Sequence, residues 1–277
     1  MATHHTVPVG WLAERLGQPN LVIADCRFNL GHKGDGQAAY QAGHIPGAIY
    51  LDLERDLSAP IGIQGGRHPL PDPEQLAALF SRIGIDETTT VVAYDAQDMA
   101  MAARLWWLLR YLGHERVYIL DGGFPAWEAA GLPVTQEVPA PTPRTFISRL
   151  RPEMLVTAEQ VLARPPQTVL IDSRAPERYR GEVEPLDPKA GHIPGSTNYF
   201  FKENLKPDGT LQAPQALQQR FAALPEGEIM VYCGSGVTAC VNVLALLESG
   251  RTNVKLYAGS WSDWCSRDLP VATGDEE

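Results

Sequence analysis

The chain repeats itself, and this duplication constrains the fold more than any other feature of the sequence. The hexapeptide Ala-Gly-His-Ile-Pro-Gly occupies residues 42–47 and occurs again at 190–195. Three further landmarks keep the same order in both halves: an apolar run closed by Asp-x-Arg (22–27 and 169–174), an apolar run ending at Asp95 or Cys233 (91–95 and 229–233), and a glycine-aromatic segment (122–127 and 259–264). Chance explains such an order poorly, so the sequence predicts two copies of one domain.

The length agrees with a duplication. A chain of 277 residues is long for one compact domain and suits two domains of about 130–150 residues each. Residues 135–150, between the copies, carry three prolines and little periodicity, which is typical of a linker. We predict a first domain over residues 5–134, a linker over 135–152 and a second domain over 153–272.

Within each half, short β-rich runs alternate with helical stretches. The runs 169–172 and 229–232 are apolar at successive residues, as in strands buried on both faces. Residues 100–112 and 237–248 have apolar side chains at helical spacing. This alternation predicts an α/β fold in which each domain has a central parallel sheet flanked by helices, with ligands beyond the carboxyl ends of the strands.

Composition narrows the classes of partner. The formal net charge of −10 argues against nucleic acid, whose phosphates need a basic face. An anionic substrate must therefore be held by local cations, because the overall field repels it. The N-terminus lacks the pattern of a secretory signal, and no segment approaches the roughly 18 apolar residues of a membrane span. We expect a soluble cytoplasmic protein that binds neither nucleic acid nor membrane.

The cysteines have neither disulfide nor zinc-site spacing. The four of them form no Cys-x-x-Cys pair and no Cys/His cluster of zinc-finger type, so we expect no metal site. Cys26 stands where the second half has Ser173, and Cys240 lies within the helical run; both are typical of small buried residues. Nothing in the sequence indicates how far Cys265 is exposed.

Cys233 is the candidate nucleophile. It follows a buried strand directly, and Gly234 and Gly236 let the backbone curl around it before a helix begins. N–H groups and the dipole at a helix start favour a thiolate or a terminal persulfide there. The ordinary alternative is a small buried hydrophobe. The first half supplies a control, because it has Asp95 and no loop glycines at the matching place.

Taken together, these features resemble those of tandem rhodanese-type sulfurtransferases. The repeated hexapeptide, the Asp-x-Arg strands, the tryptophan-containing endings and the loop Cys233–Ala239 carry the resemblance, which covers roughly residues 5–272. The loop is most similar to that of 3-mercaptopyruvate sulfurtransferases; thiosulfate-preferring enzymes tend to have basic residues after the cysteine. The resemblance implies a Cys233 persulfide, no cofactor, a small anionic sulfur donor, and an acceptor that is cyanide or a thiol, for example on a thioredoxin-like protein.

The resemblance also suggests which residues bind the donor. Arg178 matches an arginine that binds the donor anion in similar enzymes, although a solvated surface arginine is the alternative. The loop residues Gly234, Ser235, Gly236, Val237 and Thr238 are expected to line the donor site. Thr238 is also a candidate for capping the following helix.

Ser235 has two open interpretations. It is either a plain cap of the helix or a group that bonds the donor carbonyl and relays a proton. Similar mercaptopyruvate enzymes are proposed to use a histidine and an aspartate of the first half with this serine, and His44 and Asp35 are the candidates here. His44 recurs as His192, which favours a structural role instead.

The Asp-x-Arg pairs and one departure from the family pattern complete the prediction. Asp172 and Arg174 recur as Asp25 and Arg27, which indicates internal charge pairs. Mercaptopyruvate enzymes often place a second substrate arginine just before the Gly-His-Ile-Pro motif. The region 184–189 has Leu186 or Asp187 there, and its single basic residue, Lys189, is displaced. The predicted pocket is therefore one cation short.

Other functions fit less well. A cysteine phosphatase needs Cys-x5-Arg to hold phosphate, and the corresponding residue is Ala239. A non-catalytic binding module would not need Cys233 and its glycines, although fold alone does not exclude one. Thiosulfate remains an alternative donor to 3-mercaptopyruvate, with the same mechanism.

Overall fold

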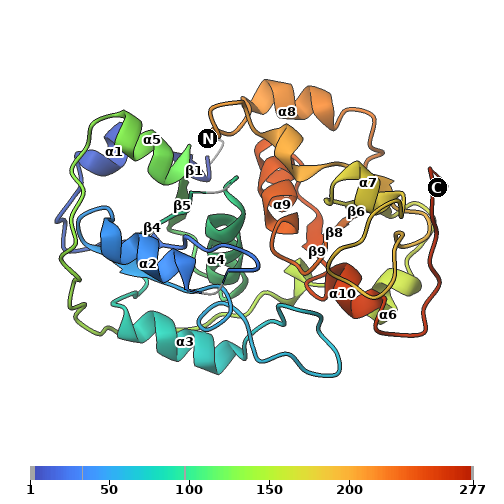
Figure 1. Cartoon of the computed structure of the whole chain (residues 1–277), viewed down its shortest axis with the longest axis horizontal. Coiled ribbons are helices and arrows are strands. Elements are labelled where there is room, and N and C mark those ends of the chain that lie inside the picture. The colour runs from blue at the N-terminus through green and yellow to red at the C-terminus, as the bar shows by residue number, and fades with distance from the viewer. Residues whose placement is uncertain (1–3, 33, 97, 276–277) are drawn as a thin grey trace. The chain divides into compact units, whose positions relative to one another are not determined.

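The computed structural model describes residues 4–32, 34–96 and 98–275, and its contacts divide the chain into two units (Figure 1). Unit 1 comprises Met1–Ser58, Pro71–Arg151 and Lys206–Leu211. Unit 2 comprises Ala59–Leu70, Pro152–Leu205 and Gln212–Glu277. The predicted linker thus groups with unit 1 as far as Arg151. A short segment of the first half, Ala59–Leu70, belongs to unit 2.

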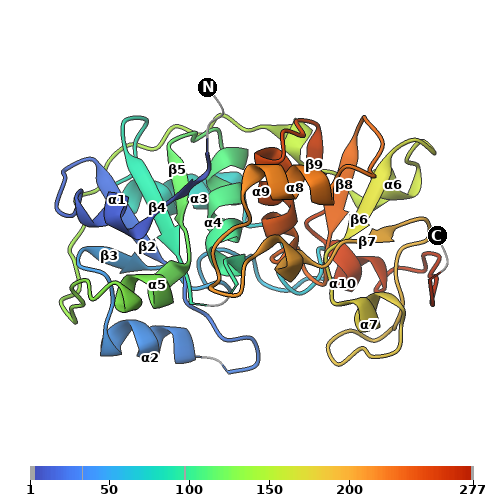
Figure 2. The same cartoon turned by 90° about the horizontal axis from the view of Figure 1, so that it is seen from above.

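Unit 1 has a five-stranded parallel sheet flanked by helices (Figure 2). Its strands, in spatial order, are β1 (Thr6–Val7), β5 (Val117–Leu120), β4 (Thr90–Tyr94), β2 (Leu21–Asp25) and β3 (Ala48–Tyr50). Its helices are α1 (Val9–Ala13), α2 (Asp35–Ala42), α3 (Pro73–Arg82), α4 (Ala100–Tyr111) and α5 (Gly123–Ala129). Strands β2 and β4 lie at the centre and run parallel in register from Leu21 opposite Thr90 to Asp25 opposite Tyr94.

Unit 2 repeats this plan with a four-stranded parallel sheet. Its strands, in spatial order, are β7 (Thr197–Asn198), β6 (Val169–Asp172), β8 (Ile229–Tyr232) and β9 (Val254–Leu256). Its helices are α6 (Ala158–Leu162), α7 (Pro176–Tyr179), α8 (Pro214–Arg220), α9 (Ala239–Glu248) and α10 (Ser260–Trp264), with 3-10 turns at Pro152–Met154 and Phe201–Asn204. The predicted α/β class, with a parallel sheet in each domain, is confirmed.

The repeated sequence landmarks make matching contacts in the two units. The indole N–H of Trp127 donates to the carbonyl of Pro133 at 2.8 Å, and Trp264 donates to Pro270 at the same distance. Both prolines lie in a Leu-Pro-Val sequence that occurs at 132–134 and again at 269–271. Each bond therefore anchors the end of its repeat to a buried tryptophan. Both tryptophans are buried in the core of their unit, so they serve packing.

Each Asp-x-Arg motif forms a buried ion pair at the end of a central strand. Nη2 of Arg27 donates to Asp25 at 2.6 Å and to the carbonyl of Gly43 at 2.7 Å. Arg174 makes the same two bonds, to Asp172 at 2.6 Å and to Gly191 at 2.7 Å. The glycine is the one that precedes the repeated histidine. A lone buried charge is costly, so each arginine is paired with its aspartate, and the predicted internal charge pairs are confirmed. The bond from the arginine to the glycine carbonyl links the hexapeptide to the strand.

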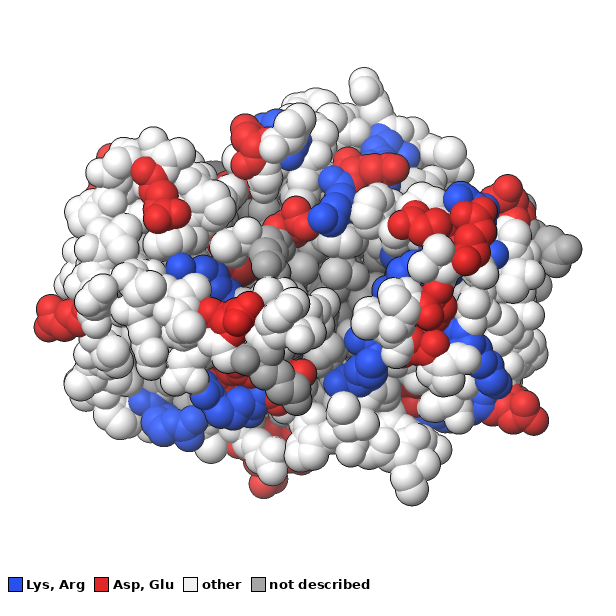
Figure 3. Space-filling model, in the orientation of Figure 1, with Lys and Arg blue, Asp and Glu red and all other residues white. Residues whose placement is uncertain are grey.

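The distribution of surface charge and the lengths of the helices are the remaining features of the fold. On the face drawn in Figure 3, basic and acidic side chains are intermixed. Among the helices that the structure describes, none combines the length and the apolar character needed to cross a membrane.

Candidate active site

Cys233 lies at the carboxyl end of the central strand β8, where ligands bind in open parallel sheets. Its side chain is buried, with a relative exposure of 1%. The backbone N–H of Gly236 donates to Cys233 Sγ at 3.2 Å. This bond requires the loop to turn back on itself, and Gly236 has φ +77°, a conformation that glycine adopts without strain.

The segment around α10 is hydrogen-bonded to the backbone of this loop. Ser260 Oγ accepts the N–H of Cys233 at 3.1 Å, and the N–H of Trp261 donates to the carbonyl of Cys233 at 2.9 Å. Ser262 N–H bonds the carbonyl of Gly234 at 2.9 Å. The backbone on both sides of the sulfur is therefore fixed before any donor arrives.

Ser235 bonds a histidine that the sequence analysis did not identify. Its hydroxyl lies 2.7 Å from Nδ1 of His68, and both side chains are buried. His68 belongs to Ala59–Leu70, the segment of the first half that packs with unit 2. It has no counterpart in the repeat, and its only sequence signal is the run Gly65-Gly66-Arg67-His68-Pro69.

His44 and Asp35, the predicted relay partners of Ser235, have hydrogen bonds within unit 1. The ring nitrogens of His44 lie 2.8 Å and 3.0 Å from the carbonyl oxygens of Tyr40 and Glu137. Asp35 is exposed at the start of α2 and accepts a bond from Asn29 at 3.0 Å. Both nitrogens of His44 are thus engaged by main-chain carbonyls, as suits the structural role that its repetition favoured.

Arg178, the predicted donor-binding arginine, lies on α7 and faces the cysteine loop. Its Nε and Nη2 pair with Glu184, the latter at 2.6 Å. A Cβ built on Gly234 would lie 3.4 Å from Nη1 of Arg178. The guanidinium is therefore next to the residue that follows Cys233, and its acidic partner holds it there.

A second arginine, Arg67, approaches the same glycine. Its Nη2 lies 3.0 Å from the same Cβ position on Gly234. Its Nε and Nη2 form a bidentate pair with Asp187, at 3.0 and 3.2 Å. Asp187 is one of the two residues at the place where a second arginine was expected, and it holds Arg67 beside Gly234. Lys189 instead accepts the indole N–H of Trp261 with its carbonyl.

Val237 and Thr238 complete the loop that the sequence predicts to line the donor site. Val237 is buried, and Thr238 stands at the N-cap position of α9 without a side-chain capping bond.

The other cysteines are buried as well: Cys240 and Cys265 in unit 2, and Cys26 in unit 1. Burial raises the pKa of the Cys26 thiol well above its usual value, with Asp25 adding to the effect, and it also raises the pKa of Cys265. Cys26 and Cys265 are therefore poor nucleophiles.

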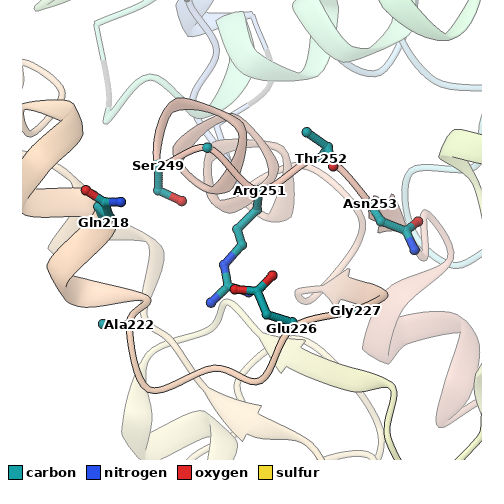
Figure 4. A pocket seen from close by; sticks show the side chains of 9 residues that line it. Gln218, Ala222, Glu226, Gly227, Ser249, Arg251, Thr252 and Asn253 are labelled. Atoms are coloured by element: carbon teal, nitrogen blue, oxygen red, sulfur yellow. The ribbon is translucent and has the colours of Figure 1, made fainter.

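Two further features are the arrangement of possible metal ligands and a pocket in unit 2. In the portion of the chain that the structure describes, no group of histidine, cysteine and acidic side chains is arranged to hold a metal ion. A pocket of about 530 Å³ lies between α8 and the end of α9, where Arg251 faces Glu226 at 3.1 Å (Figure 4). Its lining comes from residues 218–227 and 249–253, so it is separate from the cysteine loop.

Comparisons with known proteins agree with this geometry. The rhodanese-like domain family matches residues 8–130 and 157–267. A probable 3-mercaptopyruvate sulfurtransferase of Pseudomonas aeruginosa is 48% identical over 274 residues, which covers 95% of this chain and 96% of the relative. A putative thiosulfate sulfurtransferase, SseB, of Mycobacterium tuberculosis is 41% identical, covering 91% and 90%.

A solved structure gives the same result. The chain superposes on SseA from Escherichia coli, described with the rhodanese fold and mechanism of 3-mercaptopyruvate sulfotransferases, with a TM-score of 0.81. The two share 34% identity, and the match covers 94% of this chain and all of SseA (100%). The chain therefore belongs to the rhodanese-like family and is a sulfurtransferase.

Proposed function

We propose that this sulfurtransferase takes sulfur from 3-mercaptopyruvate onto Cys233 and passes it to a thiol or to cyanide. The observation that carries the proposal is the loop itself. It encloses one sulfur atom with a backbone donor from Gly236 and brings two arginines beside Gly234. Such a site suits a donor with an anionic group a few atoms from its sulfur.

The first step forms a persulfide. The Cys233 thiolate attacks the thiol sulfur of the donor, and the carbon–sulfur bond of the donor breaks. Its electron pair stays on carbon as the enolate of pyruvate, which takes up one proton. The N–H of Gly236 stabilises the sulfur anion, as preorganised backbone donors do.

Ser235 and His68 are placed to handle that proton. We assign the relay to His68 rather than to His44, because His68 Nδ1 lies 2.7 Å from Ser235 Oγ. The hydroxyl bonds the donor carbonyl and supplies the proton that the enolate needs, and His68 replaces it. Asp35, exposed and bonded to Asn29, has no part in this scheme.

The second step returns the enzyme to its starting state. Cyanide or a thiolate attacks the outer sulfur, the sulfur–sulfur bond breaks, and Cys233 leaves as the thiolate. No redox partner is needed with cyanide, and the product is thiocyanate. We propose a thioredoxin-like dithiol as a cellular acceptor and the cytoplasm as the compartment, consistent with four buried cysteines that form no disulfide in the described part of the chain.

Cyanolysis tests the nucleophile. Wild type incubated with 3-mercaptopyruvate and cyanide is expected to release pyruvate and thiocyanate in equal amounts, and Cys233→Ser is expected to release neither. Cys26→Ser is the matched control, because the second repeat already has Ser173 at that position. Turnover that persists in Cys233→Ser would exclude this cysteine as the nucleophile. A clear preference of wild type for thiosulfate over 3-mercaptopyruvate, measured as kcat/KM, would overturn the donor assignment.

A further inference from the structure

Arg67 and His68 are neighbours in sequence, and each contacts a neighbouring residue of the cysteine loop. Arg67 approaches Gly234, while His68 bonds Ser235. The segment Ala59–Leu70 is held on unit 2 by its main chain. The N–H of Gly65 donates to Asp263 at 2.8 Å, and the N–H of Arg67 donates to Ser262 Oγ at 3.0 Å. Two main-chain hydrogen bonds therefore fix the backbone position from which the Arg67 side chain extends.

The approach is close enough to exclude side chains. A Cβ on Gly66, which has φ +74°, would lie 2.3 Å from Ser262 Oγ and 2.6 Å from the carbonyl of Gly259. Only glycine fits between the segment and the support of the cysteine loop. A charged side chain from the first half of the chain, that of Arg67, is thus held next to Gly234, the residue that follows Cys233.

Arg67 and Arg178 are held in the same way. Each uses its Nε and Nη2 edge on one buried carboxylate, Asp187 for Arg67 and Glu184 for Arg178. The two carboxylates are 2% and 3% exposed, whereas the arginines are 25% and 19% exposed. Among the residues that the structure describes, none bonds Nη1 of either arginine. Each guanidinium is fixed along one edge and has a donor left for a ligand.

The charges also balance before a donor binds. Arg67, Arg178 and Arg174 face an equal number of carboxylates, those of Asp187, Glu184 and Asp172, because Glu184 also pairs with Arg174 at 3.3 Å. Asp187 contacts both Arg67 and Arg178, the latter through Nη2 at 3.4 Å. Such a neutral cluster gives no strong attraction to a polyanion. It instead offers oriented guanidinium donors, which suit a single planar carboxylate.

We propose that Arg67, positioned by Asp187, binds the carboxylate of the sulfur donor together with Arg178. This inference rests on the proposed function, because it assigns a residue to the donor of that reaction. The carboxylate does not react, so its contacts are alike in the ground and transition states. Loss of Arg67 then raises KM and leaves kcat largely unchanged.

The test compares two donors that differ only in the carboxylate. 3-Mercaptopyruvate carries it, and 1-mercaptopropan-2-one has a methyl group in its place. For Arg67→Gln, KM for 3-mercaptopyruvate is expected to rise about 10- to 150-fold, the range for a lost hydrogen bond to a charged group. With mercaptopropanone, kcat/KM is expected to equal that of wild type.

Two further variants separate binding from folding. Arg67→Lys keeps the charge but not the bidentate geometry, and it is expected to raise KM less than Arg67→Gln does. Arg180→Gln is the control, because Arg180 follows α7, is paired with Glu182 and is more exposed than Arg178. Thermal melting of each variant shows whether the fold is intact.

The outcomes are distinct. An unchanged KM for 3-mercaptopyruvate in Arg67→Gln, with normal turnover by wild type, overturns the role of Arg67 alone. Equal losses with both donors, or a fall in kcat alone, mean that Arg67 only supports the loop, and the proposal fails. Absence of turnover of 3-mercaptopyruvate by wild type refutes the proposed donor and the carboxylate contact together.

Discussion

Replacing Gly236 by alanine tests whether the curled loop holds the reactive sulfur. Gly236 has φ +77°, and an added Cβ would lie 2.2 Å from the carbonyl oxygen of Ala258 and 2.9 Å from its carbon. Carbon–oxygen contacts are normally no closer than about 3.3 Å, so the loop must move by roughly 1 Å. That movement weakens the bond from Gly236 N–H to Cys233 Sγ, now 3.2 Å long.

Two costs follow, and they are measured separately. The left-handed conformation costs alanine about 1–2 kcal/mol of folding free energy, and the overlap adds about 1–3 kcal/mol. Loss of one hydrogen bond to a charged sulfur costs about 1.5–3 kcal/mol, which corresponds to a roughly 10- to 150-fold lower kcat. Urea unfolding reports the first cost, and cyanolysis at saturating donor reports the second.

Gly250 supplies the matched control. It also has a positive φ, +95°, and lies in unit 2, but an added Cβ would have no neighbour within 4 Å. Gly250→Ala is expected to lose about 1–2 kcal/mol of stability and to keep wild-type kcat. If Gly236→Ala keeps wild-type kcat, or if Gly250→Ala loses as much, the shape of the loop does not govern the reactivity of Cys233.

Two other predictions concern the relay and the response to pH. Ser235→Ala and His68→Asn are each expected to lower kcat about 10²- to 10⁴-fold, with little further loss in the double variant, because the two side chains act as one unit. Additive losses, or a larger effect of His44→Asn, would contradict the assignment to His68. Burial raises the pKa values of Tyr94, Tyr232 and Tyr257 well above the ordinary value of about 10. Above that pH the unfolded chain releases these protons and the folded chain retains them, so the free energy of unfolding must fall as pH rises. Urea titrations at pH 9 and 11 that gave equal stabilities would refute this.

The sequence was sufficient where the decisive contacts are local or repeated. The strands at 169–172 and 229–232 have the predicted bounds, because their apolar runs are bounded by polar residues and match across the repeat. The helices predicted at 100–112 and 237–248 begin at Ala100 and Ala239, the second later than predicted because the glycine loop precedes it. The strand and the glycines also indicate Cys233 as the candidate nucleophile, which stays a prediction.

The histidine that we propose as the relay and the second arginine beside Gly234 were not identifiable in this way. Arg67 and His68 lie in the first half of the chain, without a counterpart in the repeat, yet they contact loop residues more than 160 positions away. Their placement depends on two hydrogen bonds from the backbone N–H groups of Gly65 and Arg67 to the side chains of Asp263 and Ser262. Because the donors are backbone groups, the side chains at 65 and 67 give no sign of these bonds in the sequence. His44, in contrast, stood in a conspicuous motif, but the motif serves the packing of its own unit.

The two repeats place different side chains at one equivalent position, Asp95 in unit 1 and Cys233 in unit 2. The carbonyl of Asp95 accepts the N–H of Phe124 at 2.8 Å, just as that of Cys233 accepts Trp261 at 2.9 Å, so the two residues are equivalent in the fold. The Asp95 carboxylate bonds the N–H groups of Met101 and Ala102 at the start of α4, at 2.8 and 2.9 Å.

In both units the side chain at this position accepts backbone N–H groups near the start of a helix: those of Met101 and Ala102 in unit 1, and that of Gly236 in unit 2. In unit 1 the acceptor is a short carboxylate that caps the helix and has no reactivity toward sulfur. The turn there is left-handed at Asp98 and Met99, with φ +57° and +64°, conformations that strain residues other than glycine. In unit 2 the turn is made by Gly236, whose N–H faces the sulfur. The change from Asp95 to Cys233 thus replaces a capping carboxylate with the sulfur that we propose as the nucleophile, on an otherwise equivalent scaffold, and the added glycines allow the backbone to bond it.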